Sequence, residues 1–411
     1  MATERTGPLA GVRIIESSML GPAAITTQLA DLGAEVIKVE SPSGDYVRRM
    51  TWPIVEGVSL MHLHINRGKR SLVLDLRTPE GVEIYLDLVR GADAVIEAMR
   101  PGGLERRGLG YEKLREVNPR IVFCTISGYG MTGPYKDLPS HGVAYDVWAG
   151  LVKPETTEEG FAAIPEHPSM GIHAGPLFGA LGVLAGIVKA RDTGEGCRLE
   201  IAQSDAAAAM DWYRSETWKA YERPEDEVTG NESDNFERRA PGTAGMRDGV
   251  RYQFYETKDG YILFQASERE FWENFCRGVG RDDLFEKRPG AQYADHAVGD
   301  LELRQELKDI FLSRTSAEWM AFGGEVNTPI VNVNTPQTIA DDPQFQARFE
   351  WFPAERLGAE QLGTPIKYMD VELPVPTKAP TVGEHTDEVL HDVLGYDDAK
   401  VAALREAGAL G

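Results

Sequence analysis

Short apolar runs alternate with helical patterns over the first 130 residues of the chain. Five of these runs are typical of buried strands, namely residues 12–15, 35–40, 72–76, 93–97 and 120–127. Helical patterns cover residues 23–32, follow the start signal Thr78-Pro79-Glu80 and lie between the last two runs. Because strands that alternate with helices pair as parallel βαβ units, the pattern predicts an α/β sheet.

A longer apolar segment follows these units. Residues 171–190 are rich in glycine and alanine, which predicts a buried and closely packed helix. A strand at residues 198–202 and a second alanine-rich helix from Ser204 come next. Residues 177–188, the most apolar part, are interrupted by glycine and are too short to cross a bilayer, so we expect no membrane partner.

The pattern changes again at residues 222–237, an acidic and polar segment that predicts a linker. Beyond it, two strand-like runs are joined by Lys258-Asp259-Gly260, a hairpin signal. Three helical segments complete a smaller α+β domain: residues 271–278, 301–313 and 317–323. After a proline-rich stretch, an amphipathic helix is expected from Thr386.

Composition narrows the class of protein. The 411 residues carry a formal net charge of -22, with 42% hydrophobic and 26% charged residues, which excludes a disordered chain. The acidic balance argues against nucleic-acid and anionic-membrane binding. Cys124, Cys197 and Cys276 lie far apart and predict neither a metal site nor a disulfide framework. No signal-peptide pattern is visible, so we expect a cytoplasmic location.

Five local motifs are more specific than these general features. They are Leu29-Ala30-Asp31-Leu32-Gly33 with Gly44-Asp45, Asn66-Arg67-Gly68-Lys69-Arg70, Arg100-Pro101-Gly102, Ser127-Gly128-Tyr129-Gly130 with Gly133-Pro134-Tyr135, and Gly383-Glu384-His385-Thr386-Asp387. In this order and spacing the chain resembles the class III CoA-transferases over about residues 9–395. That group includes formyl-CoA and crotonobetainyl-CoA transferases and alpha-methylacyl-CoA racemase.

The resemblance implies a fold and an assembly. Members have an α/β, Rossmann-like large domain built from both chain ends and a smaller α+β domain from the middle, and two subunits form an interlocked dimer. On this plan, residues 1–221 begin the large domain, residues 222–330 are the linker and small domain, and residues 331–411 return to the large domain.

The resemblance also implies that a CoA thioester and a free carboxylic acid are the substrates, with no bound prosthetic group and no metal. The phosphates of CoA need cations and free main-chain N–H groups. Lys38 at the end of the second strand, with Lys69 and Arg70 in a basic loop before a strand, are candidates. Similarity to the formyl-CoA enzyme places CoA-lining positions at Met19, Ser41, Lys69, Met99, Arg106 and Lys136.

The transferases of this family use an aspartate nucleophile that attacks the thioester carbonyl. An ungapped match through Gly182 and residues 193–196 places Ile172 at that position, directly after Gly171. The downstream Asp205 supports the same register. Because isoleucine has no nucleophilic group, this chain departs from the family at the reacting position.

Two nearby polar residues are alternative candidates for chemistry. Glu166 either reaches the site through a shift of its loop or is a surface carboxylate. His141 matches the histidine segment of the racemases and is either a general base or a residue that lines the ligand. A two-base racemisation would still lack its second acid at Ile172. Trp148, Trp212, Tyr213 and Trp218 either fill a core or line an aromatic acyl pocket.

Some members of the family are heteromers of two related chains, as in succinyl-CoA:benzylsuccinate CoA-transferase. The first hypothesis is therefore a CoA-transferase subunit whose paralogous partner supplies the aspartate missing at Ile172. The alternatives are an acyl-CoA racemase or epimerase that uses His141, and a non-catalytic CoA-binding subunit.

Overall fold

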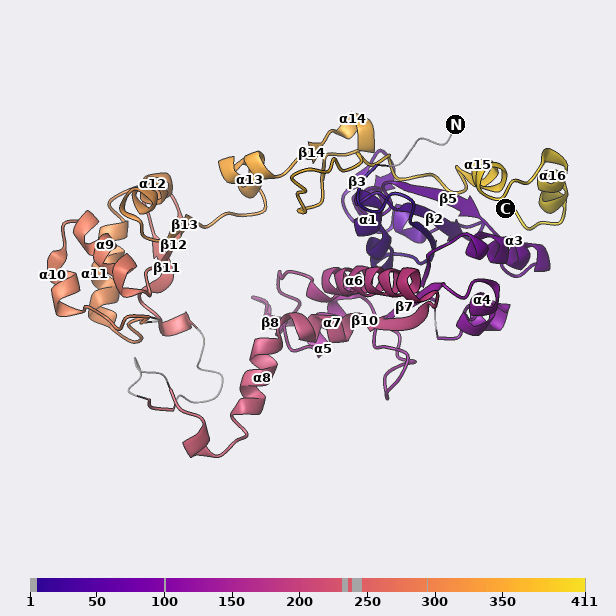
Figure 1. Ribbon diagram of the computed structural model, residues 1–411. Coiled ribbons are helices and arrows are strands. Elements are labelled where there is room, and N and C mark those ends of the chain that lie inside the picture. The colour runs from indigo at the N-terminus through magenta and orange to yellow at the C-terminus, as the bar shows by residue number, and fades with distance from the viewer. Residues whose placement is uncertain (1–5, 100, 231–235, 239–245, 294, 411) are drawn as a thin grey trace. The chain divides into compact units, whose positions relative to one another are not determined.

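The computed structural model describes residues 6–99, 101–230, 236–238, 246–293 and 295–410 (Figure 1). The chain forms two compact units, one made of Met1–Asp211 with Phe349–Gly411 and the other of Trp212–Arg348. The sequence predicts the two boundaries between these units at residues 221/222 and 330/331. In the structure the boundaries lie at 211/212 and 348/349. Helix α8 (Trp212–Ala220) and residues 331–348 therefore group with the second unit.

Six parallel strands form the central sheet of the first unit, and the predicted α/β class is confirmed. They are β1 (Arg13–Ser17), β2 (Glu35–Glu40), β5 (Lys69–Val73), β6 (Ala94–Glu97), β7 (Val122–Ser127) and β10 (Cys197–Ala202). Their spatial order is β10-β7-β6-β1-β2-β5. The chain direction across the sheet therefore reverses between β1 and β6, which is the order of a doubly wound nucleotide-binding sheet.

Strand β5 begins earlier than the apolar pattern predicts. Lys69 pairs with Val36 and Arg70 with Ile37, so both residues are part of the sheet. The expectation that Lys69 and Arg70 lie in a loop before the strand is wrong. Their charges are neutralised inside the fold, which the alternation of apolar and polar residues does not reveal.

Helices cover both faces of this sheet. Ile14 and Ile15 of β1 point to opposite faces and belong to separate cores. One core includes residues of α1 (Ala24–Asp31) and α6 (Met170–Thr193). The other includes residues of α3 (Pro79–Arg90), α4 (Tyr111–Val117) and α16 (Asp398–Glu406). Further elements of this unit are η1 (Gly21–Ala23), η2 (Tyr46–Arg49), β3 (Ile54–Val55), β4 (Val58–Ser59), α2 (Leu60–Ile65), η3 (Glu105–Arg107), α5 (Gly142–Trp148) and α7 (Gln203–Met210).

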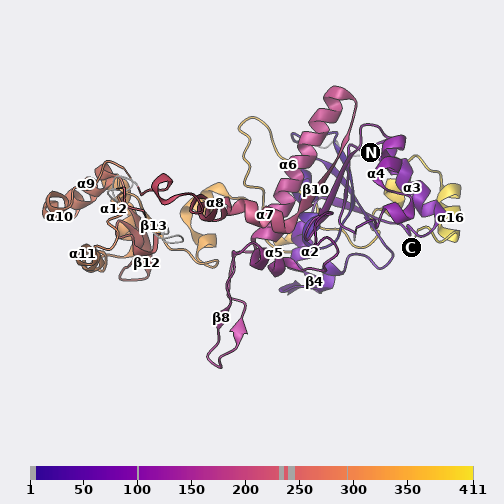
Figure 2. The ribbon, with the colours of Figure 1, turned by 90° about the horizontal axis from the view of Figure 1, so that it is seen from below.

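Helix α6 is longer than its most apolar stretch suggests. Its 24 residues are enough, by length and composition alone, to cross a membrane, so the expectation that the segment is too short is wrong. Half of its most apolar window is buried within the structure. The helix packs against α1, α7, β7 and β10, as a core helix does. A small hairpin, β8 (Glu155–Thr156) and β9 (Ala162–Ala163), precedes it in the chain (Figure 2).

The two chain ends meet in the first unit. Gly68 N donates to Thr377 O at 2.9 Å, and Asp75 N donates to Ala409 O at 2.9 Å. The predicted C-terminal helix is divided into α15 (Thr386–Glu388), a π-helical turn η8 (Val389–Val393) and α16. The returning segment also contains β14 (Trp351–Phe352), α14 (Ala354–Leu357) and β15 (Gln361–Leu362).

The second unit has a three-stranded antiparallel sheet with the predicted hairpin at its edge. The strands are β11 (Tyr252–Glu256), β12 (Tyr261–Gln265) and β13 (Ile330–Asn332). Besides α8, the helices among its described residues are η4 (Glu225–Glu227), η6 (Met246–Asp248), α9 (Arg269–Gly278), α10 (Asp282–Lys287), α11 (Leu301–Phe311), α12 (Ser316–Val326), η7 (Ile339–Asp341) and α13 (Pro343–Arg348). Phe264, Phe275 and Phe311 pack together in its aromatic core. Residues 231–235 of the predicted linker lie outside the described residues.

His62 of α2 links the two ends of the chain. Its Nδ1 lies 3.0 Å from Asn66 Nδ2, and its Nε2 lies 3.2 Å from Pro380 O. The imidazole therefore accepts at Nδ1 and donates at Nε2, which is the neutral form. Burial, together with the nearby Arg48, lowers the pKa of His62 to about 4.

We predict that His62 makes the free energy of unfolding fall as the pH drops from 6.5 towards 4. In this window the unfolded chain binds a proton that the folded chain excludes, a difference of about 3 kcal/mol for one such group. His62→Gln keeps both hydrogen-bonding functions and should flatten the dependence, measured by urea unfolding at several pH values. The exposed His141→Gln is the control, and equal slopes in all three proteins would contradict the assignment.

Candidate active site

The candidate site lies at the carboxyl ends of the parallel strands. In doubly wound sheets, ligands bind at this edge, next to the point where the strand order reverses. Here that point lies between β1 and β6. Met19, Ser41 and Met99 follow the ends of β1, β2 and β6, so the fold brings these three predicted residues to one edge.

Ile172, at the predicted nucleophile position, lies in the first turn of α6 and is half-buried. A Cβ placed on Gly142 would lie 3.0 Å from Ile172 Cγ2, and one placed on Gly21 would lie 3.7 Å from Ile172 Cβ. The isoleucine therefore packs directly against the main chain of two turns, one before α1 and one at the start of α5. The side chain at this position has no ionisable group.

The start of α6 is held by a buried carboxylate. Gly171 N donates to Asp146 Oδ1 at 2.8 Å, and Asp146 is fully buried. A Cβ on Gly171 would lie 2.6 Å from Tyr145 Cβ, so only glycine fits there. Asp146 Oδ2 lies 3.7 Å from His167 Nε2. Asp146 thus satisfies a free N–H of the first helical turn and fixes the position of Ile172.

The two alternative catalytic candidates are both exposed. His141 directly precedes α5, whose first residue, Gly142, is in contact range of Ile172. Glu166 lies in the extended segment before α6, and its neighbour His167 is the residue that faces Asp146. The fold therefore places His141 beside the candidate site and Glu166 on the surface.

Lys38 and Lys69 are fully buried beneath the edge of the sheet rather than displayed on it. Glu16 lies between them, 2.8 Å from each ammonium nitrogen. Asp45 Oδ2 lies 3.2 Å from Lys38 Nζ. Burial lowers the pKa of Lys69 to about 8, whereas Glu16, Asp45 and Glu40 outweigh burial and raise the pKa of Lys38. Neither ammonium group is free to meet a phosphate in this arrangement.

Arg70 is also paired within the fold. Its guanidinium contacts Glu35 and lies 3.1 Å from Glu388 Oε1 in α15. Arg70 follows Lys69 in β5, so its side chain points to the opposite face of the sheet, where its partner Glu35 begins β2. The structure therefore does not bring Arg70 to the edge that holds the other candidates.

Exposed cations lie after the strand ends. Arg106 in η3 donates to Pro101 O at 3.0 Å, and Lys136 lies in the exposed loop after β7. Arg77, which the sequence reasoning missed, follows β5 and has a side chain that is 78% exposed. It donates to both oxygens of Asp75 and lowers the pKa of that carboxyl to about 2. Its position directly after the strand run was the signal that could have revealed it.

The aromatic candidates are divided between the units. Trp148 is exposed and its ring lies 6.2 Å from that of Tyr129, which also contacts Tyr145. Trp212, Tyr213 and Trp218 are exposed residues of α8 in the second unit. None of the four therefore fills a core. Within the described residues, no cluster of His, Cys, Asp or Glu has the arrangement of a metal site.

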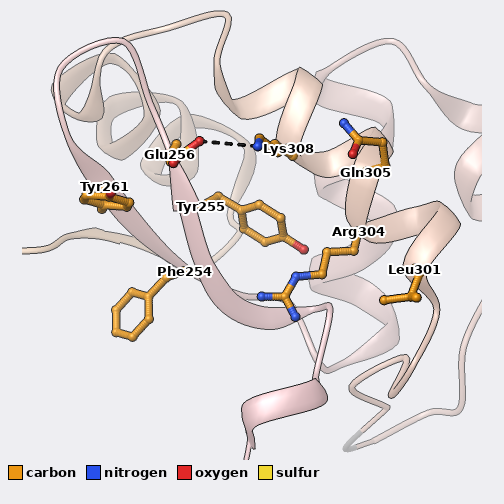
Figure 3. Close-up of a pocket in the computed structure, with 8 residues that line it drawn as sticks. All are labelled: Phe254, Tyr255, Glu256, Tyr261, Leu301, Arg304, Gln305 and Lys308. Carbon is orange, nitrogen blue, oxygen red and sulfur yellow. Dashed lines mark ion pairs between the residues drawn. The ribbon is translucent and has the colours of Figure 1, made fainter. Parts of the chain in front are cut away.

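The second unit has a groove of its own, with a volume of about 470 Å³ (Figure 3). It is lined by Phe254, Tyr255, Glu256, Tyr261, Leu301, Arg304, Gln305 and Lys308. Lys308 Nζ lies 3.6 Å from Glu256 Oε2 across it. None of the predicted site residues lines this groove.

Several known CoA-transferases are similar to this chain over most of its length. Succinyl-CoA:glutarate CoA-transferase of Homo sapiens is 27% identical over 98% of this chain and 90% of its own. The beta subunit of succinyl-CoA–L-malate CoA-transferase of Chloroflexus aurantiacus is 28% identical over 98% of both chains. Formyl-CoA:oxalate CoA-transferase of Rhodopseudomonas palustris is 28% identical over 98% of this chain and 97% of its own.

Solved structures share the fold. A CaiB/BaiF family protein from Brucella suis superposes with a TM-score of 0.75 at 26% identity, covering 95% of this chain and all of that one. Rv3272 from Mycobacterium tuberculosis gives a TM-score of 0.76 at 26% identity, covering 93% and 99%. Residues 9–386 match CoA-transferase family III, which confirms the resemblance drawn from the five motifs. The chain belongs to CoA-transferase family III.

Proposed function

We propose that this chain is a subunit of a CoA-transferase that moves CoA between an acyl-CoA and a free carboxylic or dicarboxylic acid. A paralogous chain supplies the aspartate, and the two chains form an interlocked dimer of the family type. The observation that carries the proposal is Ile172, an aliphatic side chain packed against Gly21 and Gly142 where the family reaction requires a carboxylate. The similarity to the beta subunit of succinyl-CoA–L-malate CoA-transferase, a chain of a multi-subunit enzyme by its name, supports a two-chain assembly.

The reaction follows from covalent catalysis by that aspartate. Its carboxylate attacks the thioester carbonyl, forming a mixed anhydride and releasing CoA thiolate. The thiolate attacks the aspartyl carbonyl, giving an enzyme thioester and the free donor acid. The acceptor carboxylate attacks this thioester, and the returning thiolate takes the acyl group from the new anhydride, which restores the aspartate. The part proposed for this chain is to hold the CoA nucleotide while the partner supplies the carboxylate.

The exposed cations of the sheet edge are the groups proposed to bind CoA. The chain is acidic overall, with a formal net charge of -22, so an anionic ligand needs local positive charge. Arg77, Arg106 and Lys136 provide it after the ends of β5, β6 and β7. Met19 and Met99 provide apolar surface on the same edge for the adenine or pantetheine.

If a partner chain supplies the aspartate, only the complex should transfer CoA. The purified chain alone should show no exchange of labelled succinate into succinyl-CoA, whereas a mixture with a co-encoded homologue that carries Gly-Asp at this position should exchange it. Inversion of an α-methylacyl-CoA by the chain alone, abolished by His141→Ala, would instead establish the racemase. Tight CoA binding by this chain, with no turnover alone or in the mixture, would establish a silent CoA-binding subunit.

A carboxylate at residue 172 of this chain should restore the nucleophile. Aspartate is smaller than isoleucine, so Ile172→Asp fits between Gly21 and Gly142 without a clash. With succinyl-CoA, the variant should form a covalent CoA adduct on residue 172 that intact-protein mass spectrometry detects and hydroxylamine removes. Ile172→Asn is the matched control of the same shape and should form none. A folded, CoA-binding Ile172→Asp chain without an adduct would contradict the proposal that residue 172 occupies the nucleophile position.

The proposed contact between Arg77 and a phosphate of CoA can be tested by substitution. Arg77→Ala should raise the dissociation constant of CoA about tenfold, since one charge-assisted hydrogen bond to a phosphate contributes about 1.5 kcal/mol. Titration calorimetry with CoA and with dephospho-CoA, which lacks the 3′-phosphate, shows which phosphate Arg77 contacts. If it contacts the 3′-phosphate, Arg77→Ala should weaken the binding of CoA but not of dephospho-CoA. Arg90→Ala, an exposed arginine at the end of α3, is the control. Equal affinities for wild type and Arg77→Ala would remove Arg77 from the site.

A further inference from the structure

Residues 18–23, the turn between β1 and α1, form one wall of the candidate site. Gly21 in this turn faces Ile172, and Met19 is exposed at its tip. Leu20 adopts φ 56° and ψ -145°, a conformation that residues with a side chain rarely adopt. Such a turn keeps its shape only where the surrounding structure holds it.

Three buried side chains hold the main chain of this turn, one at each of three points. Lys38 Nζ donates to Ser18 O at 2.6 Å. Leu20 N donates to Asp45 Oδ2 at 3.3 Å. Lys69 Nζ donates to Ala23 O at 2.8 Å. The start, middle and end of the turn are therefore each fixed by a charged group from a different segment of the chain.

Glu16 joins these holding groups into one network. Its Oε1 accepts from Lys38 and its Oε2 contacts Lys69, while Lys38 also pairs with Asp45. The four side chains are fully or almost fully buried, and their two positive and two negative charges balance. Thr26 in the first turn of α1 also donates to Glu16, so the network reaches the helix that follows the turn.

A buried network of this kind is not explained by stability alone. Removing ions from water costs free energy, and well-packed apolar side chains of similar size are often equally stabilising. Apolar side chains, however, cannot hold two carbonyl oxygens and one N–H group of a strained turn. The charges are therefore best explained by the geometry that they impose on residues 18–23.

We propose that Lys38 and Lys69, neutralised by Glu16 and Asp45, are positioning residues of the CoA site. They fix the turn of residues 18–23 against Ile172, and they do not themselves contact a phosphate. This inference rests on the proposed function for the identity of the ligand, but not for the positioning of the turn. It assigns to the two lysines a role different from the one that the resemblance implies.

Two double variants test this proposal. Each removes one positive and one negative charge of the network, and each frees one end of the turn of residues 18–23. Lys38→Met with Asp45→Asn removes the hold on Ser18 O and leaves the Glu16–Lys69 pair intact. Lys69→Met with Glu16→Gln removes the hold on Ala23 O and leaves the Lys38–Asp45 pair intact. Neither variant leaves a buried charge without a partner, so both are expected to fold.

The first measurement is amide hydrogen exchange of a peptide that spans residues 18–24 of the full chain. The second is the dissociation constant of CoA from titration calorimetry. Each double variant should speed exchange of this peptide at least tenfold and raise the dissociation constant at least tenfold. If a double variant fails to fold, the single variant Asp45→Asn is measured in its place. Its amide oxygen can still accept from Leu20 N, so exchange of the peptide should speed up less than is expected for the double variants.

The matched control breaks another buried ion pair of the same unit. Arg67 and Asp31 lie 2.6 Å apart and are almost fully buried, and Arg67 donates to Asp31 and Gln361 rather than to the turn. Arg67→Met with Asp31→Asn should lower global stability, while exchange of the 18–24 peptide and CoA affinity stay within twofold of wild type. Exchange that rises equally in the control and the network variants would overturn the proposal.

The two measurements separate this inference from the proposed function. Faster exchange with unchanged CoA affinity would overturn the role of the network in the site, although the network would still hold the turn. A wild-type chain that does not bind CoA would overturn the proposed function. Faster exchange confined to the network variants would, even then, support the positioning of the turn by Lys38 and Lys69.

Discussion

The first unit depends on the neutralisation of charges inside its sheet. Lys38 and Lys69 lie on adjacent strands, β2 and β5, and share the carboxylate of Glu16 on β1. An unpaired ion at this depth would cost several kcal/mol, so the three strands must align with Glu16 directly opposite Lys38. A slip by one residue would turn these side chains to the opposite face and leave their charges without partners. The same register aligns the strand ends that carry the candidate site.

The sequence predicted most of the large-unit sheet because its strands are apolar and its turns carry clear signals. It failed at the start of β5, where Lys69 and Arg70 have the composition of a solvated loop. Their burial depends on Glu16 and Glu35, which come from distant parts of the chain, and no local pattern contains that information. The C-terminal helix was located correctly at Thr386, but its division by a π-helical turn was not foreseen.

Three of the predicted site residues, Met19, Ser41 and Met99, follow strand ends at one edge of the sheet. Motif spacing predicts the nucleophile position at Ile172, because that inference needs only a register along one helix, and this stays a prediction. The surroundings of Ile172 come from separate turns, so only the fold reveals that Gly21, Gly142 and the Gly171–Asp146 hydrogen bond enclose it. Arg77 was missed because an arginine after a strand looks solvated until the strand end is placed beside its neighbours.

The surroundings of Ile172 indicate which property of the site this chain has kept. Gly171 admits no side chain beside Tyr145, and Asp146 fixes the start of α6, so the position of residue 172 is specified from several sides. An isoleucine held in this way contributes shape and apolar contact, but it has no lone pair for the thioester carbonyl. On the proposed function, a site with a fixed wall, an exposed cationic edge and no nucleophile would bind CoA without opening its thioester. Chemistry at such a site therefore requires a carboxylate from elsewhere, which is the physical reason to look for it on a second chain.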